Sequence, residues 1–247
     1  MRVIVHGATG AMGRQICALT EKGYLGSSLA AAVSPEGGPG IILTLGEVRA
    51  PADVVVDFSH HTAVGGLLDF AVEKGLPVVI ATTGFDENEL ALIQKAAEKV
   101  PVFRSANMSV GVAVLCRLAK EAARAFPDAD IEIVETHHNR KLDAPSGTAL
   151  MLAEAVREVR PGAELACGRS GQHKREKKEI GIQSLRMGNV VGIHEIHIAT
   201  GTQILTLRHE AQDRALFAEG AMEAARFLIG KGPGLYGMED LLAGDAQ

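Results

Sequence analysis

The sequence predicts an α/β fold in two parts: a parallel-sheet domain flanked by helices, and a smaller α+β domain with a mixed or antiparallel sheet. Up to about residue 108, short β-branched runs alternate with segments of helical period, whereas strand-like segments later follow one another directly. The 247 residues are 47% hydrophobic but only 4% aromatic. The core must therefore be packed mainly from Ala, Val, Ile and Leu, which favours helices layered on a sheet.

The first part has the pattern of a βαβ series. Its expected strands are continuous apolar runs, as in sheets covered on both faces, at residues 3–5, 30–33, 54–56, 78–81 and 102–103. Apolar positions between them recur at helical spacing: Met12, Ile16 and Leu19, then Val64, Leu67, Leu68 and Ala71, then Leu90, Ile93 and Ala97. Such a series predicts right-handed crossovers and a Rossmann-like parallel sheet.

The second part begins with a long helical stripe and continues with strands. The stripe is Val110, Val114, Leu118 and Ala122, and a strand is expected at 131–136. A polar loop and another helix follow, the helix with Ala149, Leu152, Ala153 and Val156 on one face. Three strand-like segments then lie between Ile180 and His209, separated by Gly188-Asn189 and Gly201-Thr202, which we interpret as hairpin turns.

A last stripe of apolar residues at helical spacing predicts a helix near the end of the sequence. It comprises Phe217, Ala221, Ala224 and Leu228 and ends at Gly230. We expect this segment to pack on the first part. The predicted domains are therefore residues 1–108 with 215–247, which bind a dinucleotide, and residues 109–214, which bind substrate and form the oligomer.

Composition excludes several classes of protein. The formal charge is −5, and the basic stretch 173–178 is interrupted by Glu176 and contains no aromatic residue, so no nucleic-acid partner is expected. The longest apolar candidate for a membrane span, residues 105–116, is too short, and the N-terminus lacks a secretory pattern. Cys17, Cys116 and Cys167 are far apart in the sequence, and we interpret them as reduced core thiols. We expect a cytoplasmic protein without a metal or membrane partner.

Three glycines follow the first strand at the start of the first helix. Gly7, Gly10 and Gly13 form G-x-x-G-x-x-G, a variant of the G-x-G-x-x-G dinucleotide pattern. A helix N-terminus offers unpaired N–H groups and the positive end of its dipole to a pyrophosphate. The alternative is that the glycines only make a tight turn. Their position at the first strand of a βαβ series favours dinucleotide binding.

The end of the second strand bears on the choice of nucleotide. It reads Ser34-Pro35-Glu36-Gly37, and no basic residue occurs between Lys22 and Arg49. A 2′-phosphate would therefore lack a local cation, whereas Glu36 could reach a ribose 2′-hydroxyl. The sequence predicts that NADH serves at least as well as NADPH.

Two more polar loops follow strands of the same part. Residues 57–59 (Asp-Phe-Ser) end the third strand, and residues 81–84 (Ala-Thr-Thr-Gly) end the fourth. Ligands of open α/β sheets collect at such ends, although each loop could equally be an ordinary connection.

Residues 135–149 form a loop dense in titratable groups between a strand and a helix. His137 and His138 are adjacent and should point to opposite sides, so one of them can face a reacting atom and exchange a proton near neutral pH. Lys141 adds a cation, and the N–H groups near Gly147 and Thr148 open the next helix as an anion site. The alternative is a solvated polar loop. A metal site is disfavoured by the ligand spacing, and the other histidines are taken as core, edge or surface residues.

These motifs together resemble the 4-hydroxy-tetrahydrodipicolinate reductase (dihydrodipicolinate reductase) family of lysine biosynthesis. The resemblance rests on GATGAMGR at the N-terminus, DFS at 57–59, TTGF at 82–85, ANMSVG at 106–111 and, above all, ETHHNRKLDAPSGTA at 135–149. It implies an NAD(P)H-dependent reduction of a cyclic dicarboxylate to tetrahydrodipicolinate in the diaminopimelate route.

The resemblance also implies roles for particular residues. His137 would be the proton donor and Lys141 the second catalytic residue, with His138, Gly147 and Thr148 on the substrate carboxylates. The cofactor, NADH or NADPH, would contact Gly7, Ala8, Thr9, Gly10, Ala11, Met12, Ser34, Ala81, Thr82, Thr83, Ser105, Ala106, Asn107 and Met108. A homotetramer joined through the sheet of the second domain is also implied.

Departures from the family pattern concern the cofactor alone. Ala81 stands where many members have Gly, and Ser34-Pro35 replaces the acidic and basic pair of some members. Two alternatives remain: a related amino-acid pathway dehydrogenase, and a non-catalytic NAD(P)-sensing protein. An acylating semialdehyde dehydrogenase would need a nucleophilic cysteine, and a sensor would not need His137 or Lys141.

Overall fold

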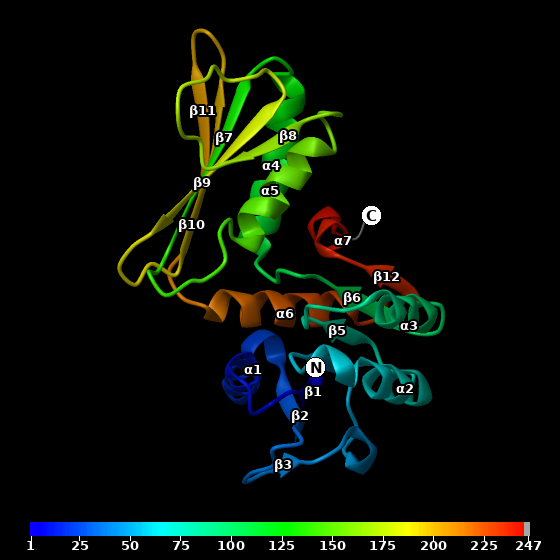
Figure 1. Ribbon diagram of the computed structural model, residues 1–247. Coiled ribbons are helices and arrows are strands. Elements are labelled where there is room, and N and C mark those ends of the chain that lie inside the picture. Colours follow the sequence, from blue (N-terminus) through cyan, green and yellow to red (C-terminus); the bar gives the residue numbers. More distant parts are fainter. Residues whose placement is uncertain (245–247) are drawn as a thin grey trace. The chain divides into compact units, whose positions relative to one another are not determined.

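The computed structural model describes residues 1–244 and divides the chain into two compact units (Figure 1). One unit contains Met1–Val110 and the segment that begins at Ala215, and the other contains Gly111–Arg214. The last three residues of the expected first domain, 245–247, lie outside the described residues. The α/β fold class is confirmed, with a parallel sheet in the first unit and a mixed sheet in the second.

The first unit is built on a seven-stranded sheet whose pairings are all parallel. The strand order is β12-β6-β5-β4-β1-β2-β3. The strands are β1 (Arg2–His6), β2 (Ser28–Val33), β3 (Ile41–Ile42), β4 (Val54–Asp57), β5 (Val78–Ile80), β6 (Pro101–Arg104) and β12 (Gly234–Tyr236). From β3 to β6 this is the order of doubly wound dinucleotide-binding domains, whose ligand crevice opens between β1 and β4.

Helices cover both faces of this sheet. The helices of this unit are α1 (Ala11–Glu21), α2 (Val64–Lys74), α3 (Glu87–Ala97), α6 (Ala215–Leu228) and α7 (Met238–Ala243), with short 3₁₀ turns η1 (Tyr24–Gly26), η2 (Leu45–Glu47) and η3 (His61–Ala63). α2 and α3 pack on one face through Leu67 and Ile93, and α1 and α6 pack on the other through Ile16 and Ala221. Helix α6, although distant in the sequence, therefore packs on the first sheet.

The second unit contains a five-stranded mixed sheet of order β11-β10-β7-β9-β8. Its strands are β7 (Asp130–His137), β8 (Glu164–Cys167), β9 (Glu179–Arg186), β10 (Gly192–Ala199) and β11 (Ile204–Ala211). The hairpin predicted at Gly201-Thr202 is confirmed, because β10 and β11 pair antiparallel. The hairpin predicted at Gly188-Asn189 is wrong, because β7 lies between β9 and β10 and pairs with both.

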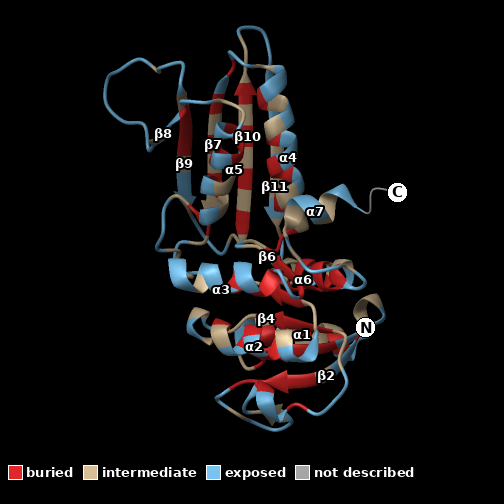
Figure 2. Ribbon diagram, turned by 90° about the vertical axis from the view of Figure 1, so that its right-hand side faces the viewer, coloured by how far each residue is buried: buried red, intermediate tan, exposed pale blue. Residues whose placement is uncertain are grey.

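Two helices, α4 (Val110–Ala125) and α5 (Gly147–Arg157), cover one face of the mixed sheet (Figure 2). The predicted stripe of α4 is on the wrong face, since Val114 and Leu118 are 39% and 48% exposed. A strict spacing of four drifts about 40° around a helix at each step. The structure instead buries Val112, Leu115, Cys116, Ala119 and Ala123, which follow one helix face through steps of three and four, with Leu115 and Cys116 adjacent.

Strand β7 carries the core stripe of this unit into a polar end. Alternate residues of a strand share one face, and Ile131 and Ile133 pack against the helices on that face. Glu135 and His137 continue the same stripe and are also buried. The helix-covered face of the sheet therefore changes from apolar to ionisable toward the end of β7.

Candidate functional site

A buried carboxylate is at the centre of the polar end of β7. Glu135 is 0% exposed. Arg186, at the end of β9, donates to both of its oxygens at 2.9 and 2.7 Å, and the backbone N–H of Ser146 donates at 3.1 Å. Burial raises the pKa of Glu135, but the hydrogen bonds from Arg186 and His137 outweigh it and lower the pKa to about 2. Glu135 is therefore an anion near neutral pH.

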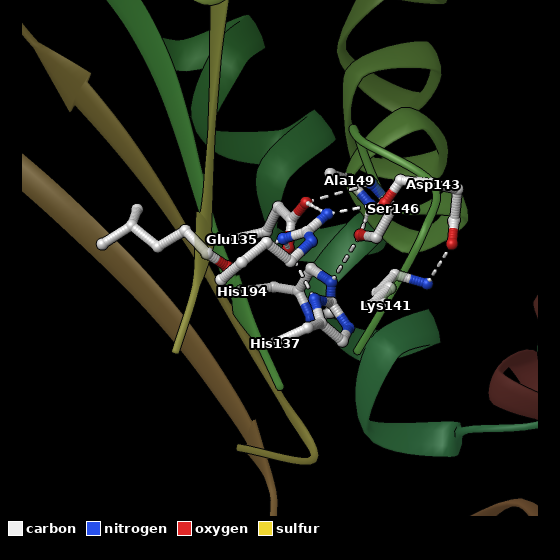
Figure 3. Close-up of polar contacts among 9 residues, drawn as sticks. Glu135, His137, Lys141, Asp143, Ser146, Ala149 and His194 are labelled. Atoms are coloured by element: carbon white, nitrogen blue, oxygen red, sulfur yellow. Dashed lines mark hydrogen bonds and ion pairs between the residues drawn. The ribbon is translucent and has the colours of Figure 1, made fainter. Parts of the chain in front are cut away.

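Two histidines pack beside this carboxylate (Figure 3). His137 Nδ1 lies 2.5 Å from Glu135 Oε2, and the ring of His137 meets that of His194 edge to face, with centroids 5.1 Å apart. His194, on β10, is 4% exposed, and its Nε2 lies 3.0 Å from Ser146 Oγ. Burial, followed by the charge of His137, lowers the pKa of His194 to about 4. His194 is therefore neutral where most enzymes work.

The loop after β7 carries the remaining predicted residues of this unit. The N–H of His138 donates to Val190 O at 2.7 Å, and Lys141 Nζ pairs with Asp143 Oδ1 at 2.9 Å. Burial, followed by the nearby cation Arg140, lowers the pKa of His138. Lys141 is thus already partnered by a carboxylate from its own loop, a contact that the sequence did not indicate.

Helix α5 begins beside these side chains. Ser146 is its N-cap, and its hydroxyl accepts from the N–H of Ala149 at 3.2 Å. Gly147 and Thr148 form the first turn, where the helix dipole favours a negative charge. His137, Lys141 and the start of α5 thus lie together in Figure 3, as candidates for a proton donor, a cation and a carboxylate site.

The glycine turn of the first unit is shaped by close packing. Gly7 has a φ of +81°, and a Cβ there would lie 2.5 Å from Phe58 O after β4, while a Cβ on Gly13 would lie 2.1 Å from Gly7 O. Gly10 is the N-cap of α1 and provides no side chain to cap the helix. The absence of side chains at Gly7 and Gly13 therefore allows β1, β4 and α1 to pack closely. The absence of one at Gly10 leaves the first N–H groups of α1 accessible.

A groove of about 1110 Å³ lies over this turn. Of the predicted cofactor residues, Gly7, Thr9, Gly10 and Ser34 line it. Arg14 and Glu36 also line it, and Thr9 Oγ1 donates to Glu36 Oε2 at 2.8 Å. Arg14 comes from α1 rather than from the loop after β2, so the groove contains a cation although the sequence has no basic residue between Lys22 and Arg49.

The other predicted cofactor residues occupy different environments. Ala8 and Met108 are 2% exposed in the core, and Met12 packs against that core. Ala81, Thr82 and Thr83 follow β5, and Ser105, Ala106 and Asn107 follow the adjacent β6. These loops emerge at the carboxyl end of the sheet, as the glycine turn does. Ala11, Thr83 and Ala106 are exposed.

A buried polar network supports the loop after β5. Asp57, 2% exposed at the end of β4, accepts from Thr82 Oγ1 at 2.7 Å. His6 Nδ1 lies 2.8 Å from the other oxygen of Asp57. The loops predicted from Asp57-Phe58-Ser59 and Ala81-Thr82-Thr83 are thus tied to each other and to β1.

Sequence reasoning missed three groups of the second unit: Glu135, Arg186 and His194 were not given roles. A signal for two of them exists, because Glu135 continues the inward stripe of Ile131 and Ile133, and His194 shares its inward stripe with Ile196 and Ile198. They are also direct partners in the β7–β10 register. Arg186 is opposite His137 in the β7–β9 register, a pairing that the incorrect hairpin concealed.

The cysteines are not all core thiols. Cys116 is buried and Cys17 is half-buried, but Cys167 is exposed at the end of β8, because β8 is a short edge strand. Among residues 1–244, no group of three or more His, Cys, Asp or Glu side chains could hold a metal ion. None of the helices formed by those residues combines the length and apolar character needed to cross a membrane.

Two family models together match nearly the whole chain. The model described as "Dihydrodipicolinate reductase, N-terminus" matches residues 1–108, and "Dihydrodipicolinate reductase, C-terminus" matches residues 111–242. The chain belongs to the dihydrodipicolinate reductase family. The chain is accordingly an oxidoreductase with a pyridine-nucleotide cofactor.

Individual relatives are similar over nearly their full length. The 4-hydroxy-tetrahydrodipicolinate reductase of Caldanaerobacter subterraneus subsp. tengcongensis is 45% identical over 247 residues, covering 98% of each chain. That of Alkaliphilus oremlandii is 41% identical over 245 residues, again 98% of each. The solved structure of dipicolinate-bound dihydrodipicolinate reductase from Paenisporosarcina sp. TG-14 has a TM-score of 0.83 and 27% identity, covering 97% of this chain and 98% of that one.

Proposed function

We propose that this protein reduces 4-hydroxy-tetrahydrodipicolinate to tetrahydrodipicolinate in lysine (diaminopimelate) biosynthesis, with NADH or NADPH as the reductant. The observation that carries the proposal is the association of His137, bound to Glu135, with Lys141 and the start of α5. Family membership of both units supports the reaction class.

The first unit fits a reduced nicotinamide dinucleotide. Gly10 leaves the start of α1 without a side-chain cap, and the groove over it has room for an extended ligand. We assign nucleotide contact to the predicted residues of the glycine turn, to Ser34 and to the loops after β5 and β6. When bound, the reduced nicotinamide supplies the hydride.

The second unit supplies the substrate site and the proton. The N–H groups of Gly147 and Thr148, with His138 and Lys141, bind the two carboxylates of the substrate. The 4-hydroxyl group of the substrate leaves as water, and hydride adds to the resulting conjugated ring. His137 donates the proton that completes the reduction, since an imidazole can transfer a proton near neutral pH. A substrate carboxylate can replace Asp143 as the partner of Lys141, which keeps the cation paired before and after binding.

We further propose a cytoplasmic homotetramer built through the face of the mixed sheet that α4 and α5 leave uncovered. Leu185 and Ile204 are 42% and 68% exposed, and the registers place both on that face. Leu185→Glu should shift the mass measured by light scattering from tetramer to smaller species, whereas a wild-type monomer would contradict the assignment.

The reaction is tested by mixing purified protein with NADH or NADPH and enzymatically generated substrate. Loss of reduced-nicotinamide absorbance that requires both protein and substrate is the expected result. Lys141→Ala should lower kcat/KM roughly 10²-fold because it removes a charge that binds the anionic substrate. Wild-type protein that binds the nucleotide but does not turn over would refute the proposed activity.

A further inference from the structure

We propose that Glu135 is a positioning residue for proton transfer: held by Arg186 and the start of α5, it binds Nδ1–H of His137 and leaves Nε2 to deliver the proton. The inference rests on the proposed role of His137 as proton donor. It adds Glu135 and Arg186 to the functional residues, although neither is expected to touch the substrate or the nucleotide.

Two residues hold the carboxylate of Glu135 through three hydrogen bonds. Arg186 donates to both oxygens at 2.9 and 2.7 Å, and the Ser146 N–H donates at 3.1 Å. Arg186 is itself anchored, because it also donates to Asp143 O at 2.7 Å. A buried carboxylate with this many donors cannot rotate without losing charge-assisted hydrogen bonds. It therefore provides a fixed acceptor for the ring of His137.

This acceptor keeps a proton on Nδ1 of His137. An ionised carboxylate can only accept, so the 2.5 Å contact requires the proton on Nδ1. The backbone carbonyl of His137 is also bound, accepting from the Met187 N–H at 2.9 Å. The ring is thus oriented through its backbone and Nδ1, and Nε2 is the atom left for transfer.

The neighbouring strand keeps the Nε2 side of the ring accessible. A Cβ on Gly192 of β10 would approach Nε2 of His137 to 3.1 Å and Cδ2 to 3.5 Å. Among the described residues, Nε2 of His137 has no hydrogen-bond partner. The absence of a side chain at residue 192 therefore prevents crowding of the atom that should face the substrate.

Several charged or titratable groups surround His137. From β7 comes Glu135, and from the loop after it come His138, Lys141 and Asp143. The neighbouring strands contribute Arg186 (β9), His194 (β10) and His209 (β11). Glu135 is the anion in contact with the ring, whereas Arg186 and Lys141 are cations. Substitution of Glu135 therefore changes the charge that contacts His137 directly.

The test is the pH dependence of kcat/KM in Glu135→Gln, with NADH binding followed by fluorescence titration. At high pH, kcat/KM falls as the acid loses its proton, and we call this part of the profile the limb. Loss of the carboxylate should move the limb to lower pH by about one unit or more, because an adjacent opposite charge favours the protonated acid. We expect kcat to fall roughly 10- to 100-fold, with NADH affinity unchanged. A purely structural residue would not move the limb.

Glu132→Gln is the matched control. Glu132 is on the same strand, faces the opposite side of the sheet and pairs with Arg175 at 3.2 Å. The control should keep the wild-type limb. Glu135→Gln with Arg186→Gln removes both charges and leaves no unpaired buried ion, so it provides a folded variant if the single one is unstable. Its limb should shift in the same direction by a smaller amount.

The possible results distinguish the positioning role of Glu135 from the proton-donor role of His137 on which it rests. A folded Glu135→Gln protein, or the double variant, with the wild-type limb and less than about threefold loss of kcat overturns the positioning role. Retention of full activity by His137→Gln, measured in parallel, overturns the proton-donor assignment instead. A shifted limb in Glu135→Gln together with an inactive His137→Gln supports both.

Discussion

Two side chains of opposite charge line one groove in the first unit, and they should set the nucleotide preference. Glu36 accepts from Thr9 and Ser34, and hydrogen bonding from Ser34, the largest cause, lowers its pKa. Its charge disfavours a 2′-phosphate, whereas Arg14 of the same groove favours one. We retain the expectation that NADH serves at least as well as NADPH.

Glu36→Gln should raise kcat/KM for NADPH relative to NADH roughly fivefold, because it removes one unfavourable charge contact in water. Arg14→Ala should lower the same ratio. Glu47→Gln, an exposed change in η2, is the control. The preference is measured by steady-state kinetics with each nucleotide, and a wild-type enzyme that prefers NADPH by about tenfold or more would contradict this account.

His194 should make stability depend on pH between about 4 and 6.5. Its folded pKa is about 4, with burial as the largest cause, whereas an unfolded histidine titrates near 6.5. The unfolded chain therefore binds the proton first as pH falls through this window. The free energy of unfolding should drop by roughly 3 kcal/mol from pH 7 to pH 4 through this residue.

Urea unfolding at several pH values measures this dependence, with His194→Gln and the exposed-loop control His173→Gln. The dependence between pH 6.5 and 4.5 should be reduced in His194→Gln alone. Glu135 contributes at lower pH, because its folded pKa of about 2 lies below its unfolded value; its stabilisation is lost from about pH 4.5 downward. Equal slopes for wild type and His194→Gln would show that His194 is not kept neutral.

The sequence predicted a site residue when its partners were close to it in the chain, and missed it when they were distant. The loop 137–148 could be predicted as a site because its titratable groups are close in the chain. Arg186 and His194 are 51 and 59 positions from Glu135 in numbering, and only the strand order brings them to it. Arg14 was missed for the same reason.

At the level of elements, the spacing between α1 and β1 depends on Gly13. A Cβ at this position would lie 2.1 Å from the carbonyl oxygen of Gly7, and backbone cannot move aside as a flexible side chain can. Gly13→Ala should therefore lower the free energy of unfolding by about 1–3 kcal/mol and weaken nucleotide binding.

Gly66→Ala is the matched control for this substitution. Gly66 is a helical glycine of α2 with open space around it, so alanine should stabilise the protein by about 0.5–1 kcal/mol. Urea unfolding compares the two variants. Equal stability would mean that α1 can move away from β1 without cost.

The longer elements could be predicted because each carries its own periodicity. β3 and β12 have two and three residues, too few for a pattern, and their formation depends on pairing with β2 and β6. The path from β9 to β10 across β7 was also unpredictable from turn residues, since Gly188-Asn189 suits a hairpin and a longer connection alike. Local sequence determines elements better than it determines which strands become neighbours.

At the level of the whole molecule, the two units divide the proposed chemistry. Residues for the nucleotide are in the unit of β1–β6, and residues for the substrate and the proton are in the unit of Gly111–Arg214. Substitutions in the second unit should therefore change turnover without changing nucleotide affinity, which makes the two functions separable by experiment.

The most direct test of the central claim is single-site replacement of the proposed proton donor. His137→Gln should lower kcat roughly 10²-fold or more, while the Kd for NADH, measured by fluorescence titration, remains that of the wild type. A His137→Gln protein with wild-type kcat would contradict the account.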